Sequence, residues 1–519
     1  MKPSRRASLE PLARSQVHPL GLDTKAATPE RPSRVVHAKK TSYVVRMPNQ
    51  LRTMFASALL AAACSGNESG EAAGGGTDTS TGGAGGQMAS TGSGGSGGGG
   101  GSEYPVYPGC AAPATTFTRT VYVDPAAGDT GDGSEAKPFG SLASTLAKKM
   151  IAPGDHVILL PGDHGALQVS KYSNPELENA TTWTWFDFQP GATAAGLSIG
   201  DMAFWLITGA EVSASRAQVM GALYTVNSSH DVVLVDAHLY TVKDSTGWIV
   251  KDWLEAADGV FLRNGSCLSV GRTKIVNTRF GIAILSDGMA RPATSMKVLV
   301  QGSEIANFSG DGLRPIASDV IIRDNYVHDV YVNDADGDTN HDDGVQMWAL
   351  NGATYDNILI ERNWIQETTD AKRPLQNDLQ GISQFDGIST NVVIRDNVVL
   401  AGAYHGIALY GCQDSTIDHN TVGNPGSNTN QLWVGVFDLK DGTPSKGLTV
   451  TDNAATTFNF SPLTTVFVNT NNIDVLDPVA TYTTFDKASM VFNLAPKVGS
   501  VLAGKGAGSS LKQPPASLP

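Results

Sequence analysis

Between residues 258 and 453 the chain repeats one short pattern of apolar and polar positions. An apolar run with a charged end leads into an Asn, and a Gly with alternating apolar neighbours follows. The Asn copies are Asn325, Asn363, Asn397, Asn420 and Asn453. The Gly copies are Gly259, Gly281, Gly312, Gly344, Gly381, Gly406 and Gly435. A unit this short cannot bury its own apolar face, so it must stack on its neighbours.

The spacing of the repeat predicts the architecture. Successive Asn copies lie 38, 34, 23 and 33 residues apart, and the longer spacings must carry loops. The copies hold short Val- and Ile-rich runs with a period of two and no helix-length period. We therefore predict an all-β, single-stranded parallel β-helix (solenoid), in which equivalent residues stack about 4.8 Å apart. The Asn column suits a turn with left-handed backbone and amides that hydrogen-bond along the stack. A β-sandwich with chance Asn turns is the alternative.

Both ends of the repeat region carry family-like motifs. The stretch from Val121 to Gly165, with its Tyr-Val-Asp-Pro and Pro-Gly-Asp-His sequences, resembles the opening of right-handed parallel β-helix proteins of the pectate-lyase-like superfamily. The stretch from Phe492 to Gly506 is similar to that superfamily's closing motif. The resemblance covers residues 119–507 and implies a right-handed β-helix with a short N-terminal capping helix near Ser141 to Met150. It is weak for the reaction, because the superfamily includes lyases, hydrolases, epimerases and non-catalytic adhesins.

The N-terminal segments predict export. Residues 1–46 carry 10 Lys or Arg against 3 Asp or Glu, and we expect a disordered, non-native extension before a start at Met47. The following apolar run is too short to span a bilayer but fits a signal-peptide core. Its Leu-Leu-Ala-Ala-Ala-Cys end resembles a bacterial lipoprotein box, which implies that residues 47–64 are a lipoprotein signal peptide and that Cys64 is lipidated. An ordinary secretory peptide is the alternative.

The remaining boundaries follow from composition. We predict a flexible Gly/Ser/Thr-rich linker over residues 65–118, the β-helix domain over residues 119–507 and a disordered tail over residues 508–519. A lipid anchor followed by a tether indicates a domain held at the bacterial cell envelope surface, or outside the cell, that contacts the membrane only through its anchor. We expect the protein to be a monomer.

The net charge disfavours one class of function, nucleic-acid binding, and the cysteine content leaves disulfide pairing open. The net charge is −13, and without residues 1–46 (10 − 3 = +7) it becomes −20, which disfavours nucleic-acid binding. Cys110, Cys267 and Cys412 are too far apart to be paired from spacing alone. We expect Cys267 and Cys412 to be buried as small apolar residues.

Alignment of the Gly copies predicts a groove. The first and third positions after Gly are apolar and should point inward, as in Val260 and Leu262. The outward positions are Arg314, Gln346, Trp348, Ser383, Phe385 and Tyr410. The positions just before Gly are Asp258, Phe280, Asp311, Asp343, Gln380, His405 and Val434. Polar, aromatic and titratable groups thus gather on the third to sixth copies, which favours a groove for an extended polymer over a merely solvated face.

An Asp-rich insertion precedes Gly344. Five aspartates lie between residues 334 and 343, with a Gly among them. Alternating oxygen ligands around a Gly turn suit Ca²⁺, although the segment lacks the Glu of an EF-hand. We predict Asp334, Asp336, Asp338 and Asp342 as Ca²⁺ ligands, with a metal-free polar turn as the alternative.

The candidate residues fit two reaction classes on an acidic polysaccharide. In a lyase or C5-epimerase, a base removes the proton beside a uronate carboxylate, whose charge must be neutralised. In an inverting hydrolase, paired carboxyl groups act as general acid and general base. The sequence partly resembles the motifs of polygalacturonases. A non-catalytic carbohydrate binder or adhesin is the third possibility. We favour the lyase or epimerase. The predicted catalytic residues are His341, Asp343, His405, Asp311 and Arg314. The predicted substrate-binding residues are Gln346, Trp348, Gln380, Phe385, Tyr404, Tyr410 and Arg373.

Overall fold

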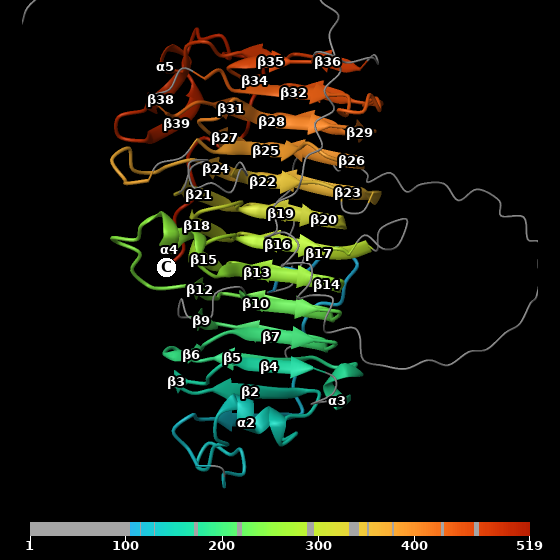
Figure 1. Cartoon of the computed structure of the whole chain (residues 1–519), viewed down its shortest axis with the longest axis vertical. Coiled ribbons are helices and arrows are strands. Elements are labelled where there is room, and N and C mark those ends of the chain that lie inside the picture. Colours follow the sequence, from blue (N-terminus) through green and yellow to red (C-terminus); the bar gives the residue numbers. More distant parts are fainter. Residues whose placement is uncertain are drawn as a thin grey trace, which may run out of the picture. The chain divides into compact units, whose positions relative to one another are not determined.

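The computed structural model describes residues 104–519, apart from residues 115, 129, 171–174, 215–220, 288–294, 332–341, 350–351, 376–377, 427–429 and 461–466. These residues form a right-handed parallel β-helix, in which three sheets run the length of the stack (Figure 1). The predicted fold class is therefore confirmed. No helix in the described ranges has the length and apolar character needed to cross a membrane.

Most coils contribute one strand to each sheet, in sequence order, and the pairing within all three sheets is parallel. Strand β29 is an addition, because it pairs with β26 beside β30 in the same sheet. The 14-stranded sheet contains β1 (Arg119–Val123), β2 (Asp155–Leu159), β5 (Thr184–Phe188), β8 (Ala203–Thr208), β11 (His230–Val235), β14 (Ser266–Gly271), β17 (Ser295–Gln301), β20 (Ser318–Arg323), β23 (Thr354–Glu361), β26 (Ile388–Arg395), β29 (Cys412–Gln413), β30 (Thr416–Asp418), β33 (Thr449–Thr451) and β36 (Val468–Thr470). The 11-stranded sheet contains β4 (Leu167–Ser170), β7 (Leu197–Gly200), β10 (Ala222–Asn227), β13 (Asp258–Arg263), β16 (Ile282–Leu285), β19 (Leu313–Ile316), β22 (Asp343–Met347), β25 (Gln380–Gln384), β28 (His405–Tyr410), β32 (Trp433–Phe437) and β35 (Thr457–Asn459). The 12-stranded sheet contains β3 (Gly162–Asp163), β6 (Ala192–Ala194), β9 (Glu211–Ser213), β12 (His238–Tyr240), β15 (Lys274–Thr278), β18 (Glu304–Phe308), β21 (Tyr326–Val330), β24 (Trp364–Gln366), β27 (Val398–Leu400), β31 (Thr421–Gly423), β34 (Ala454–Ala455) and β37 (Ile473–Asp474).

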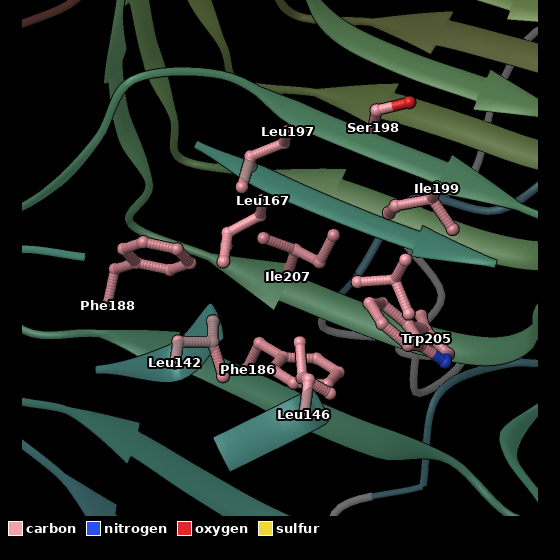
Figure 2. A pocket seen from close by; sticks show the side chains of 11 residues that line it. Leu142, Leu146, Leu167, Phe186, Phe188, Leu197, Ser198, Ile199, Trp205 and Ile207 are labelled. Atoms are coloured by element: carbon pink, nitrogen blue, oxygen red, sulfur yellow. The ribbon is translucent and has the colours of Figure 1, made fainter. Parts of the chain in front are cut away.

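Four short helices and an antiparallel hairpin complete the described fold. They are α2 (Leu142–Ala147), α3 (Pro175–Glu178), α4 (Val250–Leu254), α5 (Pro478–Thr481) and the hairpin of β38 (Tyr482–Asp486) with β39 (Val491–Pro496). Helix α2 is shorter than predicted and begins after Ser141, whose hydroxyl accepts the backbone N–H of Ser144 at 3.3 Å. Leu142 and Leu146 of α2 pack onto Phe186 and Leu167 at the first coils and line a small apolar cavity there (Figure 2).

The apolar core fills the space between the three sheets. The inward positions predicted from the Gly copies are buried, including Val260, Leu262, Val345 and Ile407, which are all at most 1% exposed. They belong to one continuous apolar cluster that runs from the first coils to the last. Each coil therefore stabilises the next by removing its apolar surface from water.

A ladder of Asn side chains follows the predicted column. The amide of Asn325 donates to Asn363 at 2.9 Å, Asn363 donates to Asn397 at 3.0 Å, and the ladder continues to Asn472. Asn363 also donates to the carbonyl of Ile322 at 3.0 Å, so the amides satisfy the backbone at the corner of each coil. The left-handed residue is the one before each Asn, with φ of 51° at Arg362, because that residue makes the turn while the Asn points into the stack.

We expect Asn363→Ala to lower the free energy of unfolding by about 2–4 kcal/mol, because the fully buried amide serves the coils on both sides and its partners would lose their hydrogen bonds. Urea denaturation measures the change. Asn472→Ala is the matched control, because this last rung is only partly buried and water can replace its bonds. An equal loss in both variants would contradict the role of the buried ladder.

The Gly column keeps adjacent coils close together. A Cβ on Gly281 would lie 2.2 Å from the carbonyl oxygen of Gly312, which is far inside van der Waals contact. The predicted last copy departs from this register, because Gly435 pairs with Ala408 instead of Gly406. The residue beside His405 is therefore Trp433, and the expected neighbour Val434 is buried in the core.

The segment before the first strand contradicts two predictions. The predicted flexible linker extended to residue 118, yet Tyr104 packs against Leu206 and Val233, and Tyr107 is buried as well. Cys110 forms a disulfide with Cys267, which was expected to be a buried free thiol. The expectation failed because the 157-residue separation of the two cysteines gives no local signal. Cys412 is buried and free, as predicted.

The C-terminal segment is also ordered, which contradicts the predicted disordered tail over residues 508–519. The Ser509 backbone N–H donates to the Thr421 hydroxyl at 2.9 Å, and the Ser509 hydroxyl donates to the Asp396 carbonyl at 2.9 Å. Farther along, the carbonyl of Leu518 accepts a hydrogen bond from Lys274. The tail is polar in sequence but satisfies polar groups on the outer side of the coils, a pairing that composition alone does not show.

Candidate functional site

The predicted groove residues lie on the outer face of the 11-stranded sheet. Strand pairing places Gln346 beside Ser383 and Ser383 beside Ala408, so these outward positions form one column. Asp343 pairs with Gln380, and His405 follows on the next coil at the entry of β28. The structure therefore brings together side chains from coils that are 25–37 residues apart in the sequence.

Asp311 and Arg314 form a buried ion pair on β19 and the turn before it. Asp311 is 0% exposed, and its carboxylate accepts bonds from the Arg314 Nε and from the backbone N–H of Asp343, the latter at 2.9 Å. The Arg314 guanidinium lies 3.5 Å from the centre of the Phe280 ring and 5.4 Å from the Trp348 ring. Arg314 is thus held in place by a charge and by aromatic faces.

Asp343 is held just as firmly at the start of β22. Its side chain is 0% exposed, and its two oxygens accept bonds from the Ser383 hydroxyl and from the Gln346 amide, the latter at 3.1 Å. Gln346 itself is 8% exposed. This group positions neighbouring side chains and has little access to solvent.

An aromatic cluster covers the next three coils on the same face. It consists of Phe385, Tyr404, His405, Tyr410, Trp433 and Phe437. The ring centre of His405 lies 4.3 Å from that of Tyr404, 5.0 Å from that of Phe385 and 4.8 Å from that of Trp433, whose plane is perpendicular to the imidazole. Tyr404 is 53% exposed, so its ring is open to solvent. Burial raises the pKa of the half-buried Tyr410, so this phenol stays protonated.

Gln380 lies between the two groups. Its side chain is 7% exposed, and its amide oxygen has no hydrogen-bond partner among the described residues. At the strand spacing of about 4.8 Å, Gln380 is one coil from both Asp343 and His405. A buried amide oxygen without a partner costs free energy, so the position is suited to a hydrogen-bond donor from a ligand, such as a sugar hydroxyl.

Arg373 does not belong to this face. It was predicted to bind substrate, but it is 7% exposed and pairs with Asp329 at 3.2 Å. Its guanidinium also donates to the carbonyl of Glu367 at 2.9 Å and lies 4.7 Å from the Tyr331 ring. The prediction failed because an Arg in a loop gives no indication of a buried acidic partner 44 residues away.

Several predicted residues cannot be placed. His341, Asp334, Asp336 and Asp338 lie outside the described residues. Asp342, the remaining predicted Ca²⁺ ligand, is 4% exposed, and its carbonyl accepts the Gln380 N–H at 2.9 Å. Asp342 therefore lies on the coil next to Gln380, and the Ca²⁺ site stays a prediction.

Sequence analysis missed Glu367, in the loop between β24 and β25. It is 6% exposed, and its carboxyl accepts the Leu379 N–H at 2.9 Å, next to Gln380. Its pKa is raised to about 7, mainly by burial and also by the Asp378 carboxylate, while the Leu379 hydrogen bond and Arg373 oppose the shift. A single Glu in a loop carries no pattern that marks it as buried.

We expect the stability of the protein to fall between about pH 4.5 and pH 7 because of Glu367. The folded state keeps the Glu367 proton up to a pKa of about 7, whereas the unfolded chain loses it near 4.5, so folding becomes less favourable as the pH rises. The difference between the folded and unfolded pKa of Glu367 corresponds to a change of about 3 kcal/mol in the free energy of unfolding. Glu367→Gln should remove this slope and raise the melting temperature at pH 8, whereas the exposed Glu135→Gln should change neither. An unchanged slope in Glu367→Gln would contradict the assignment.

Comparison with known proteins agrees with the fold. The model of the right-handed β-helix region family matches residues 256–461. No curated protein matches the sequence. The structure is similar to the pectate lyase Pel9A, with 13% identity, a TM-score of 0.38, and coverage of 77% of this chain and 90% of that chain. It is similar to a mannuronic acid specific polysaccharide family 6 lyase from human gut microbiota (10%, 0.36, 69% and 92%) and to PfbA, a surface adhesin of Streptococcus pneumoniae (10%, 0.34, 62% and 79%). These likenesses concern the fold and assign no activity.

Proposed function

We propose that the chain is an exported, membrane-tethered β-helix protein that acts on an acidic, uronate-containing polysaccharide as a lyase or C5-epimerase. The observation that supports this most is the junction on the outer face of the 11-stranded sheet. There the Gln380 amide oxygen, which has no hydrogen-bond partner among the described residues, lies one coil from His405, whose ring is framed by exposed and half-buried rings. Aromatic faces suit the apolar faces of sugar rings, and a neutral imidazole among them can accept a proton through its ring nitrogen.

His405 is the proposed base. In the neutral form, the imidazole takes the proton from the carbon beside the uronate carboxylate. In a lyase, the electron pair then forms the C=C bond and breaks the bond to the leaving glycosidic oxygen, which takes a proton from the Tyr404 hydroxyl. In an epimerase, the same carbon takes a proton on the opposite face instead. Tyr404 adjoins His405 and is open to solvent, as this role requires.

The charge of the carboxylate must be offset during this step. Arg314 lies about three coils, or about 14 Å, from His405, so the two residues would meet different sugars. Gln380, one coil away, can donate an N–H of its amide nitrogen to the carboxylate at the reacting sugar, while its amide oxygen, which has no partner among the described residues, can accept a hydrogen bond from a sugar hydroxyl. We also propose that Ca²⁺ held by Asp334, Asp336, Asp338 and Asp342 supplies positive charge there when it is bound.

The hydrolase alternative is less well supported. An inverting glycosidase needs two accessible carboxyl groups with room for a water molecule between them and the sugar. The carboxylates of Asp311 and Asp343 are 0% exposed and already accept hydrogen bonds from protein groups. We therefore propose that these two residues position Arg314 and Gln346 and take no direct part in the chemistry.

The purified chain should be incubated with pectate, alginate and glycosaminoglycans, with Ca²⁺ and with a chelator. A lyase yields unsaturated uronates that absorb in the ultraviolet, and an epimerase changes the uronate composition seen by NMR without cleavage. Reducing ends without unsaturation would favour the hydrolase. Binding without either change would favour the carbohydrate binder and contradict the proposed chemistry.

A further inference from the structure

A column of left-handed residues runs along the corner between the 14-stranded and 12-stranded sheets. The residues that precede the ladder asparagines share a φ between 51° and 58°: Asp324, Arg362, Asp396, His419, Asp452 and Asn471. The residues one position earlier form a second column that contains Glu361, Arg395 and Asp418. These outward side chains stack at the strand spacing, so each charge meets the charges of the neighbouring coils.

On the earlier coils, the carboxylates of these two columns accept hydrogen bonds or ion pairs from protein side chains. Arg362 binds both oxygens of Asp324, at 2.8 and 3.0 Å. Arg395 binds Glu361 at 2.8 Å. Asp396 accepts bonds from the hydroxyls of Ser509 and Ser510 in the C-terminal segment.

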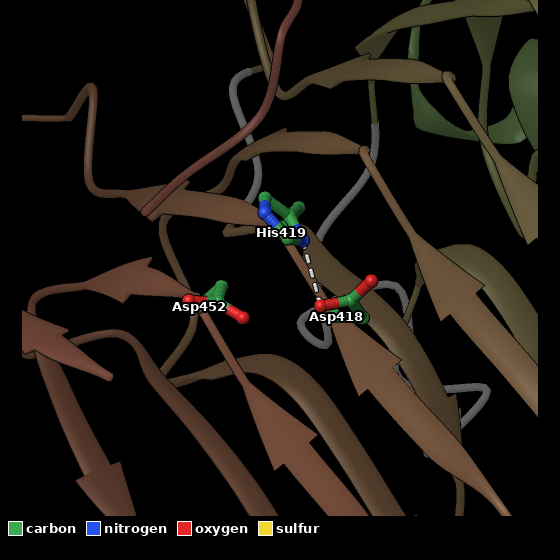
Figure 3. Close-up of side chains that lie close together, drawn as sticks. All are labelled: Asp418, His419 and Asp452. Carbon is green, nitrogen blue, oxygen red and sulfur yellow. Dashed lines mark hydrogen bonds and ion pairs between the residues drawn. The ribbon is translucent and has the colours of Figure 1, made fainter. Parts of the chain in front are cut away.

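The next two coils differ, because they bring two carboxylates and an imidazole together. One oxygen from each of Asp418 and Asp452 and one ring nitrogen of His419 lie within 4.8 Å of one another (Figure 3). His419 Nδ1 lies 2.7 Å from Asp418 Oδ1. Neither carboxylate is paired with a Lys or Arg of the described ranges, and the second oxygen of each accepts no hydrogen bond there.

The surroundings hold these groups in place. The Thr451 hydroxyl donates to Asp418 at 3.0 Å, and the Asn471 amide donates to Asp452. The two carboxylates come from adjacent coils, on β30 and directly after β33, so their separation is set by the backbone ladder. The remaining oxygens and the second ring nitrogen face partly exposed space, since all three residues are half-buried.

We propose that Asp418, His419 and Asp452 form a binding site for a divalent transition metal, with Zn²⁺ as the best match. Imidazole and carboxylate ligands suit Zn²⁺, whereas Ca²⁺ takes oxygen ligands only. Three protein ligands leave a fourth tetrahedral position to water. A bound metal would offset the negative charges of Asp418 and Asp452, which pair with no Lys or Arg of the described residues.

The site has a structural role in this proposal. The backbone carbonyl of Asp452 accepts the N–H of Gly508 at 2.8 Å, and Asn471 donates to the carbonyl of Lys505 at 2.9 Å. The metal would therefore join two coils where the C-terminal segment crosses them. Because it would bind the folded chain alone, it should stabilise the protein in proportion to its concentration.

Calorimetric titration and thermal melting of the full chain, without a polyhistidine tag and after chelator treatment, test the proposal with ZnCl₂ alone. Asp452→Asn and His419→Asn suit the backbone, because Asn471 has the same left-handed conformation in the same column. Each variant should bind one Zn²⁺ equivalent fewer, or bind it roughly tenfold more weakly, and should lose the Zn²⁺-dependent rise in melting temperature. His230→Asn is the control, because His230 meets one carboxylate, Asp231, at 2.8 Å, and this variant should titrate like the wild type.

Two results would overturn the proposal. One is a wild-type titration without any bound Zn²⁺. The other is the same stoichiometry and affinity in the wild type, Asp452→Asn and His419→Asn. The test does not depend on polysaccharide activity, so its failure leaves the proposed function intact.

Discussion

Gly381→Ala is expected to lose at least about 4 kcal/mol of the free energy of unfolding, and so to lose most of its soluble yield. A Cβ at this position would lie 2.1 Å from the carbonyl oxygen of Gly406 and 2.4 Å from a methyl group of Val399. The obstacle is backbone of the next coil, which cannot move without breaking the ladder above it. Urea denaturation, or soluble yield if the variant does not fold, measures the effect.

Gly221→Ala is the matched control. This glycine precedes β10 of the same sheet, its φ lies outside the left-handed region, and a Cβ there would meet nothing within 4 Å. The control should stay within about 1 kcal/mol of the wild type. A wild-type stability for Gly381→Ala would show that the coils are spaced more widely than the structure has them.

His405→Gln is expected to reduce turnover on the uronate polysaccharide by about 10²–10⁴-fold, the usual contribution of a general base. Gln keeps a polar planar group among the rings of Phe385 and Trp433 but cannot take the proton. The melting temperature and the dissociation constant for the polysaccharide should therefore stay close to those of the wild type. Initial rates at saturating substrate measure the effect, because they report on the chemical step more than on binding.

The exposed His230→Gln should leave turnover unchanged, since His230 lies on the 14-stranded sheet. If His405→Gln retained full turnover, the base would have to be another group, and the chemistry proposed for Tyr404 would fall with it. A parallel loss of binding and turnover would instead indicate that His405 only packs the aromatic cluster.

The sequence predicts the stacking of the coils well, but it does not predict which terminal segments pack on their outer side. The Asn and Gly columns are local signals repeated in each coil, so the coils, the inward apolar positions and the buried ladder could be inferred. The disulfide from Cys110 to Cys267 and the docking of Ser509 join segments far apart in the chain. Such contacts depend on the assembled surface, which no window of sequence describes.

The same distinction applies to the site. The column through Asp311, Asp343 and His405 follows from the repeat, and the structure places these residues on one sheet face. Whether a polar side chain is available to a ligand depends on its partners in the folded chain. Arg373 is buried against Asp329, and Glu367 has a pKa near neutrality because of its burial. Trp433 joins the cluster only because the register shifts by one residue after His405.

The most direct measurement is a crystal structure of the chain soaked with a uronate oligosaccharide. We predict sugar density along the outer face of the 11-stranded sheet from β22 to β32, with a carboxylate at Gln380 and a sugar ring packed on Tyr404. Ordered sugar on either of the other two sheets, with this face empty, would contradict it.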